Sequence, residues 1–153
     1  MKNTIHSVFR HYGHETYNPD LVLGPVNGHG GLSIKPAGSF WGSPVDSSRS
    51  WYDWCIGEDW HLESLETFFD YSISPEARIY QVRSVEDWSA FCRMFPSQEW
   101  NFGIDAPDWG KVAEKYDGLF VSLSDCPDLY YAMYGYDVDC LAIWNPDVVQ
   151  VLC

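Results

Sequence analysis

Positive charge is scarce in this sequence. Nine lysine and arginine residues stand against 22 aspartate and glutamate residues, which gives a formal net charge of −13. A field of that sign repels the phosphate backbone of nucleic acids and disfavours non-specific nucleic-acid binding. A basic partner suits such a protein, but an acidic surface also simply keeps a protein soluble. Charge alone leaves both interpretations open.

Long apolar runs are missing as well. The start of the chain holds His6, Arg10, His11, His14 and Glu15 and lacks the apolar stretch of a secretory signal. No segment approaches the roughly 20 apolar residues of a membrane span. We therefore expect a cytoplasmic protein that makes no contact with a membrane.

The cysteines lack the spacing that is typical of disulfide-bonded or metal-binding domains. There are five of them, an odd number without CxxC pairs, which matches neither a disulfide framework nor a zinc ribbon. His11 and His14 lie in an extended segment, where their spacing does not place both rings on one side. We expect free thiols and no metal site. A thiol nucleophile with His11 as its base stays an alternative.

Apolar residues, by contrast, are plentiful. They form 46% of the 153 residues, and 17% of the chain is aromatic, which is ample for a packed interior. A chain of this length is typical of one domain, so we expect a single domain over residues 1–153. The glycine-rich stretch 24–38 predicts one long loop, with residues 28–31 as a mobile flap over a ligand.

Local patterns predict an α+β domain rich in strands. Helices are expected to begin at polar caps, after Ser48 or Ser50, after Ser84 and after Asp105. The turn at residues 74–76 suggests that the strands on either side of it are neighbours. Apolar runs between turn residues predict strands at 5–12, 39–44, 67–73, 77–82, 119–123, 141–144 and 148–152.

Three polar and aromatic clusters are candidates for a functional site, at residues 10–15, 41–44 and 134–140. Taken singly, none is diagnostic. A histidine such as His11 is more often a hydrogen-bonded structural residue, and a tryptophan is more often part of the core. The clusters gain weight only when they are considered together and in order.

In that order the clusters resemble the ADP-ribosyltransferase superfamily, in particular a branch of small bacterial and phage proteins. The resemblance is carried by residues 10–13, 35–44, 50–55 and 136–149. It implies an ADP-ribosyltransferase-like mixed fold with two small packed or split β-sheets and flanking helices. It also implies NAD as the small molecule that the protein binds.

By this resemblance, His11 at the end of the first strand holds the NAD ribose or amide, with Arg10 as the competing choice. Asp139 or Asp137 engages the nicotinamide ribose, at a position where the family usually carries glutamate. A fixed carboxylate stabilises the positive charge that develops on the ribose as the nicotinamide bond loosens. Other residues expected around NAD are Tyr12, Gly13, Trp41, Ser43, Arg49 and Trp51.

NAD carries two phosphate groups, which an acidic protein repels unless local cations intervene. We therefore expect Arg10, Lys35 or Arg49 to lie near the site. Tyr12, Trp41 or Trp51 can stack on the nicotinamide ring.

The sequence therefore favours an NAD-dependent mono-ADP-ribosyltransferase, phage- or mobile-element-borne, that modifies a protein or nucleic-acid target. The alternative is a non-enzymatic acidic inhibitor or adaptor, an anti-defence mimic of nucleic acid, that binds a basic partner. A third interpretation keeps the fold but uses it only to bind a nucleotide.

Overall fold

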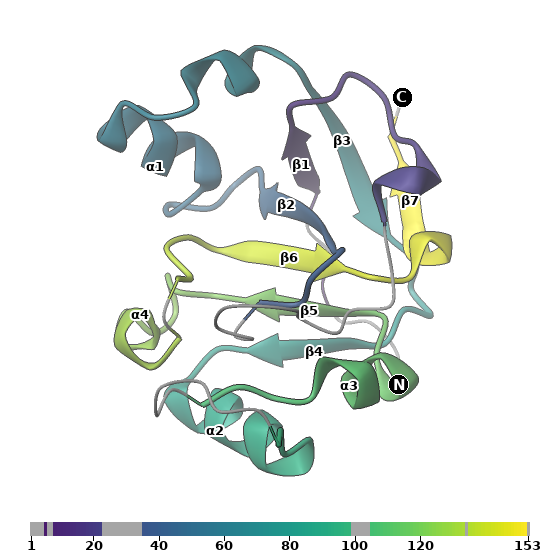
Figure 1. Ribbon diagram of the computed structural model, residues 1–153. Helices are drawn as coiled ribbons and strands as arrows, with labels where there is room; N and C mark the ends of the chain where they lie inside the picture. Colours follow the sequence, from purple (N-terminus) through teal and green to yellow (C-terminus); the bar gives the residue numbers. More distant parts are fainter. Residues whose placement is uncertain (1–4, 6–7, 23–34, 99–104, 134, 153) are drawn as a thin grey trace.

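The computed structural model describes residues 5, 8–22, 35–98, 105–133 and 135–152. Within these residues, one mixed sheet of seven strands is accompanied by four α-helices (Figure 1), so the expected α+β class is confirmed. The strands are β1 (Phe9–Tyr12), β2 (Phe40–Pro44), β3 (Phe68–Ile73), β4 (Ile79–Val82), β5 (Gly118–Val121), β6 (Cys140–Ile143) and β7 (Val149–Val151). The helices are α1 (Trp51–Glu58), α2 (Val85–Met94), α3 (Trp109–Lys115) and α4 (Leu129–Ala132), with short 3-10 turns η1 (Pro19–Leu21), η2 (Leu62–Glu66) and η3 (Pro146–Val148).

Strand β2 joins the two halves of the sheet, whose order is β4-β5-β6-β2-β1-β3-β7. Residues 40–42 of β2 pair with β6, whereas Ser43 and Pro44 pair with β1. The two neighbours therefore use different ends of β2, and the halves diverge there. In Figure 1 β1, β3 and β7 run across the direction of β4, β5 and β6.

The expectation that the strands flanking residues 74–76 are neighbours is wrong. β3 lies between β1 and β7, whereas β4 pairs in parallel with β5 at the other edge of the sheet. The reason lies in the core, because Ile73 and Ile79 both pack into one apolar cluster with Phe9 and Phe120. The turn carries the chain across that cluster from one half of the sheet to the other.

Polar caps begin the longer helices. Ser50 before α1 and Ser84 before α2 each accept a hydrogen bond from the backbone N–H three residues on, at 3.2 and 3.1 Å, as expected. Helix α3 begins after Asp108 rather than after Asp105. Pro107 forms an isolated β-bridge with Pro96, which keeps the chain extended up to Asp108 and delays the helix.

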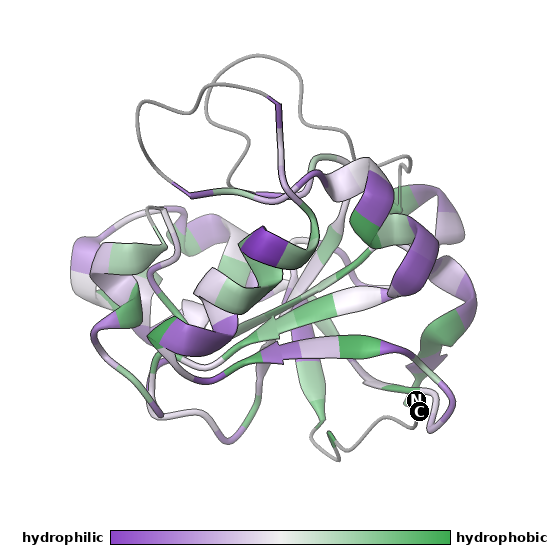
Figure 2. Ribbon diagram, turned by 90° about the horizontal axis from the view of Figure 1, so that it is seen from below, coloured by the Kyte–Doolittle hydropathy of each residue, from purple (hydrophilic) through white to green (hydrophobic). Residues whose placement is uncertain are grey.

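Apolar residues cover both faces of the sheet. Successive residues of β6 alternate between them, so Ala142 packs with α2 and α3 while Leu141 packs with the aromatic rings of β1 and β3. Figure 2 shows these hydrophobic strands in the interior and hydrophilic residues on the outer sides of the helices. Helices therefore close one face, and strand β1 with its neighbours closes the other.

Gly42 in β2 has no space for a side chain, because a Cβ there would lie 2.1 Å from the Tyr71 hydroxyl. We expect Gly42→Ala to lower the free energy of unfolding by about 1 to 3 kcal/mol, since β2 or Tyr71 must shift. Gly57 in α1 is the matched control, because a Cβ there meets nothing within 4 Å. Gly57→Ala should raise stability by up to about 1 kcal/mol. Urea unfolding measures both, and a neutral Gly42→Ala would contradict the close approach.

Candidate functional site

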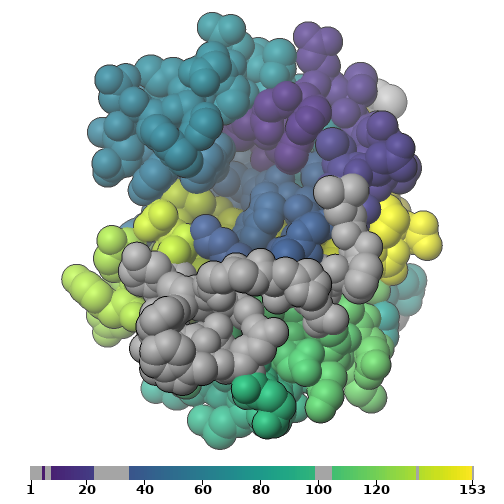
Figure 3. All heavy atoms as spheres, in the orientation of Figure 1, coloured from purple at the N-terminus to yellow at the C-terminus, as the bar shows by residue number. Residues whose placement is uncertain are grey.

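A cavity of about 350 Å³ opens where the two halves of the sheet diverge. This volume falls within the range of small-molecule sites, roughly 300 to 1,000 Å³. We call it the β1–β2 cavity. Figure 3 shows β2 (blue) and the residues before β6 (yellow-green) set back below the lobe of α1 and η2 (teal). The wall comprises residues 10–12, Lys35, residues 41–43, Trp51, residues 135–138 and Cys140.

The cavity brings together most of the residues that the sequence nominates for a site. Those in the wall are Arg10, His11, Tyr12, Trp41, Ser43, Trp51 and Asp137. They come from β1, β2, α1 and the segment before β6, which are far apart in the chain. Gly13, Arg49 and Asp139 lie outside the wall.

Strand alternation separates the two candidate residues of β1. Arg10 pairs with Ser43, so their side chains share the face of the sheet that carries the cavity. His11 lies on the opposite face, where its ring stacks on Phe40 at 4.5 Å between centroids. Of the two alternatives, Arg10 therefore presents its side chain directly to the cavity.

The guanidinium of Arg10 is fixed in place by two contacts. Its Nε and Nη2 atoms donate to the two carboxylate oxygens of Asp70 at 2.7 and 3.0 Å, and the group lies 3.9 Å above the Phe68 ring. The hydrogen bond to Asp70 raises the pKa of Arg10, so the group stays charged. Tyr12, which also lines the cavity, forms a further hydrogen bond with the Arg10 side chain.

His11 is an anchor between β1 and β2. Its Nδ1 atom lies 2.7 Å from the Trp41 carbonyl, which can only accept, so Nδ1 carries the proton. Nε2 of the neutral ring then accepts from His14 Nδ1 at 2.8 Å. Burial lowers the pKa of His11, although the bond to Trp41 opposes this, and a charged His14 lowers it further. His11 is therefore neutral at pH 7, and both of its ring nitrogens are engaged within the protein, with Trp41 and with His14.

The stacking of His11 on His14 corrects the expectation that their rings lie on different sides. Their centroids are 5.1 Å apart with nearly parallel planes. Gly13 between them has a φ of 102°, and its N–H donates to the Thr67 carbonyl at 2.9 Å. This left-handed turn folds His14 back onto His11, which an extended chain could not do.

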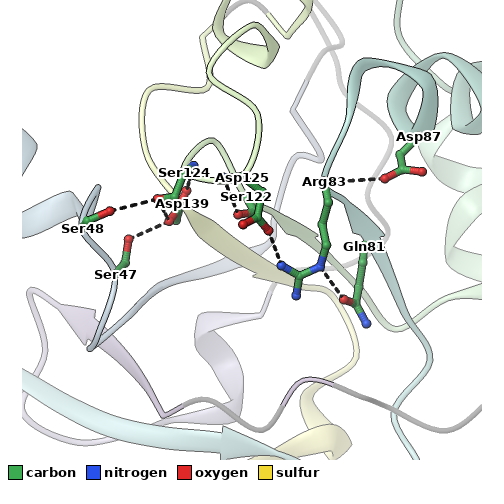
Figure 4. Close-up of polar contacts among 9 residues, drawn as sticks. All are labelled: Ser47, Ser48, Gln81, Arg83, Asp87, Ser122, Ser124, Asp125 and Asp139. Atoms are coloured by element: carbon green, nitrogen blue, oxygen red, sulfur yellow. Dashed lines mark hydrogen bonds and ion pairs between the residues drawn. The ribbon is translucent and has the colours of Figure 1, made fainter.

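Asp139 is not part of the wall of the β1–β2 cavity. Figure 4 shows its carboxylate directed toward Ser47 and Ser124. It accepts from Ser47 Oγ at 2.7 Å and from the Ser124 backbone N–H at 2.9 Å, and Ser124 Oγ also donates to it. The residue is only 4% exposed. Asp139 directly precedes β6, and these hydrogen bonds hold its carboxylate outside the cavity wall. Asp137, and not Asp139, is therefore the carboxylate in the cavity wall.

The hydroxyl of Ser43 forms hydrogen bonds to two other segments of the chain. It accepts the Trp51 backbone N–H at 3.0 Å and donates to the Asp139 carbonyl at 3.4 Å. It therefore connects β2 to the start of α1 and to the segment that leads into β6. Ser43 positions Trp51 in the cavity wall through these bonds.

Two positive charges lie at the cavity despite the acidic surface. Lys35 Nζ lies 5.6 Å from the centroid of the Tyr136 ring and 6.0 Å from that of Trp41. No carboxylate of the described residues forms an ion pair with Lys35. Together with Arg10, it gives the cavity the cations expected for phosphate groups. Tyr136, which belongs to the cluster at residues 134–140 but was given no role of its own, is a further aromatic wall residue.

The Cys140 thiol in the cavity wall is a poor nucleophile. Cys55, Cys92, Cys126 and Cys140 are free. Cys140 lines the cavity, but burial raises its pKa to about 12, so it is protonated at neutral pH. This argues against a thiol nucleophile in the cavity.

Three further expectations concern a metal site, a membrane span and a mobile flap. Among them, no group of three or more histidine, cysteine, aspartate or glutamate residues is arranged to hold a metal ion. None of the helices in the described part of the chain is long and apolar enough to cross a bilayer. The proposed flap at residues 28–31 lies outside the described residues.

A second cavity of about 540 Å³ adjoins the first and shares Asp137 and Val138 with it. We call it the α1 cavity. Arg49, which was expected near NAD, lies here instead, with its Nε donating to the Asp137 carbonyl at 3.1 Å. The other wall residues are Ser48, Ser50, Asp53, Trp54, Glu58 and Tyr130.

The two aspartates should differ in their effect on stability. Asp139→Asn weakens charge-assisted bonds from Ser47 and Ser124, and we expect it to lower the free energy of unfolding by about 1.5 to 3 kcal/mol. Asp137→Asn should change it by less than about 0.5 kcal/mol, because the residue is half-buried and its backbone bond to Arg49 remains. Urea unfolding decides this, and equal effects would contradict the assignment of Asp139 as the structural carboxylate.

The lowered pKa of His11 should appear in the pH dependence of stability. The unfolded chain, with a histidine pKa of about 6.5, takes up a proton that the folded protein resists, so stability falls as the pH drops below about 7. His11→Gln should reduce this fall between pH 7 and pH 5. NMR titration of the ring protons checks the cause. An inflection for His11 at or above 6.5 would contradict it.

Comparison with protein-family models, with curated proteins and with solved structures found no match for this chain.

Proposed function

We propose that this protein is an NAD-dependent mono-ADP-ribosyltransferase, with the nicotinamide riboside end of NAD bound in the β1–β2 cavity. One observation carries the proposal: a single cavity joins Arg10 of β1, Trp41 of β2 and Asp137 before β6. These are the three segments to which the resemblance assigns contacts with NAD. The divergence of the sheet at β2 fits the split sheet of an ADP-ribosyltransferase-like fold.

The wall of the cavity suits the chemical groups of NAD. The rings of Trp41, Trp51 and Tyr136 provide flat faces for the nicotinamide. Arg10 and Lys35 provide positive charge for the phosphate groups, which the net charge of −13 would otherwise repel. Small-molecule sites commonly combine a mainly apolar wall with a few such polar groups.

Asp137 supplies the electrostatic part of the reaction. The bond between nicotinamide nitrogen and ribose C1′ breaks, the electron pair leaves with nicotinamide, and positive charge develops on the ribose. A carboxylate at the cavity wall stabilises that charge and orients the ribose hydroxyls. A nucleophilic atom of the acceptor then bonds to C1′ and releases its proton to solvent.

The competing function is a non-enzymatic adaptor that binds a basic partner through acidic surface. The net charge of −13 favours it, but the placement of Arg10 and Lys35 at one cavity does not follow from it. The two functions differ in whether NAD is consumed.

Nicotinamide release from NAD tests the proposal, with calorimetry for NAD affinity. We expect Asp137→Asn to lower the rate roughly a hundredfold or more, with a change of less than about threefold in affinity. Asp147→Asn, an exposed aspartate outside the cavity wall, is the matched control and should leave both unchanged.

Absence of nicotinamide release in the presence of cell lysate, together with absence of NAD binding, would overturn the proposal. Full activity of a folded Asp137→Asn protein would overturn the assignment of the carboxylate.

A further inference from the structure

We propose that the surface formed by α1 and η2 docks a basic segment of a partner protein, and that the α1 cavity receives one of its lysine or arginine side chains. The proposal rests on the proposed function in one respect, that the docked partner is the acceptor of ADP-ribose. The docking itself requires no NAD.

The docking surface is apolar to an unusual degree for a solvent-facing helix. Its large side chains, Tyr52, Ile56, Trp60 and Leu62, are between 39% and 53% exposed. Figure 1 shows α1 and the turn that follows it projecting at one end of the molecule. Exposed apolar groups concentrated in this way mark interaction surfaces.

Neighbouring aromatic rings hold the Trp60 side chain in a fixed orientation. Its ring meets Trp51 and Trp54 edge-on, with centroids 5.9 and 5.5 Å apart, and Trp51 and Trp54 stack on each other at 5.3 Å. A ring fixed in this way loses little conformational entropy on binding. Tryptophan is also among the residues that dominate binding energy at interfaces.

The negative charge of the docking surface favours a basic partner. Residues 50–77 contain no lysine or arginine. The exposed carboxylates of α1, η2 and the turn between them are Asp53, Glu58, Asp59, Glu63 and Glu66. They attract a basic protein segment and repel nucleic acid, which resolves the two kinds of acceptor that the sequence leaves open.

The α1 cavity has the chemistry to hold a cationic side chain. It combines the rings of Trp54 and Tyr130 with the carboxylates of Asp53 and Glu58, and cations bind both to aromatic faces and to carboxylates. The guanidinium of Arg49 already lies 6.0 Å from the centroid of the Tyr130 ring. The wall carboxylates outnumber this one cation, so a second is attracted.

The shared wall connects docking with the reaction. Asp137 and Val138 line both cavities. A side chain anchored in the α1 cavity therefore lies beside the ribose that the proposed function places against Asp137. The anchored cation holds the docked segment in place, so that a different, uncharged nucleophilic group of that segment can bond to C1′, release its proton to solvent and displace nicotinamide with the electron pair of the broken bond.

Fluorescence anisotropy without NAD tests the docking, with a labelled peptide that alternates arginine and leucine as the probe. We expect Trp60→Ala and Glu58→Gln each to weaken binding roughly tenfold. Met94→Ala in α2 and Glu114→Gln in α3, exposed residues at the opposite end of the molecule, are the matched controls and should change it less than about twofold. Ile56→Ser replaces Trp60→Ala if that variant does not fold.

Three results would overturn the docking proposal. The first is equal weakening by the control variants, which would mean attraction by net charge alone. The second is equal binding of a peptide with glutamine in place of arginine. The third is tighter binding of duplex DNA that the same variants abolish.

A further comparison separates this proposal from the proposed function. Peptide binding that Trp60→Ala weakens, in a protein that never releases nicotinamide, supports docking and overturns the transferase. Nicotinamide release with peptide binding that neither Trp60→Ala nor Glu58→Gln affects supports the transferase and overturns docking.

Discussion

The buried carboxylate of Asp139 holds together the part of the molecule on which both cavities depend. It receives hydrogen bonds from Ser47, before α1, and from Ser124, after β5. Its own backbone N–H donates to the Arg49 carbonyl at 2.9 Å. A buried charge is costly unless its hydrogen bonds are satisfied, so these loops must meet at this residue. The start of α1 and the segment before β6 take their positions from it.

The electrostatic design has two separate regions. Cations are few in this protein, yet Arg10 and Lys35 both lie at the β1–β2 cavity. The lobe of α1 and η2, residues 51–66, has acidic residues and contains no lysine or arginine. Two ligands of opposite charge can therefore bind next to each other without competing for the same groups. An anionic dinucleotide suits the first region, and a basic protein segment suits the second.

Local signals in the sequence predicted much of the fold, because caps and apolar runs act over a few residues. The strands and the helices that begin after Ser50 and Ser84 were found in this way. The pairing of strands was not, because β3 and β4 take their partners from distant segments. The direction of the Asp139 side chain was not predicted for a related reason. Its carboxylate is held by Ser47 and Ser124, which are distant from it in the sequence.

The sequence suggested that several of the candidate residues would lie close together, but it did not predict the contacts that each side chain makes. His11 and Ser43 are at the places expected, yet their polar atoms are engaged in holding β1, β2 and α1 together. The signal in the sequence was the type of residue at a strand end, and such residues serve equally as anchors and as ligands. Only the hydrogen-bond partners distinguish the two.

Under the proposed function, aspartate stands where the ADP-ribosyltransferase superfamily usually carries glutamate, and this places a constraint on the backbone. Asp137 is one methylene shorter, so its carboxylate reaches a ribose only if the main chain itself lies close to the cavity. Arg49 donates to the Asp137 carbonyl at 3.1 Å and holds that main chain in place. Arg49, which was expected to bind NAD, thus contacts the Asp137 backbone from the α1 cavity. In the proposed reaction, a short side chain on a fixed backbone would lose little entropy as charge develops, which is how preorganised electrostatic groups stabilise a transition state.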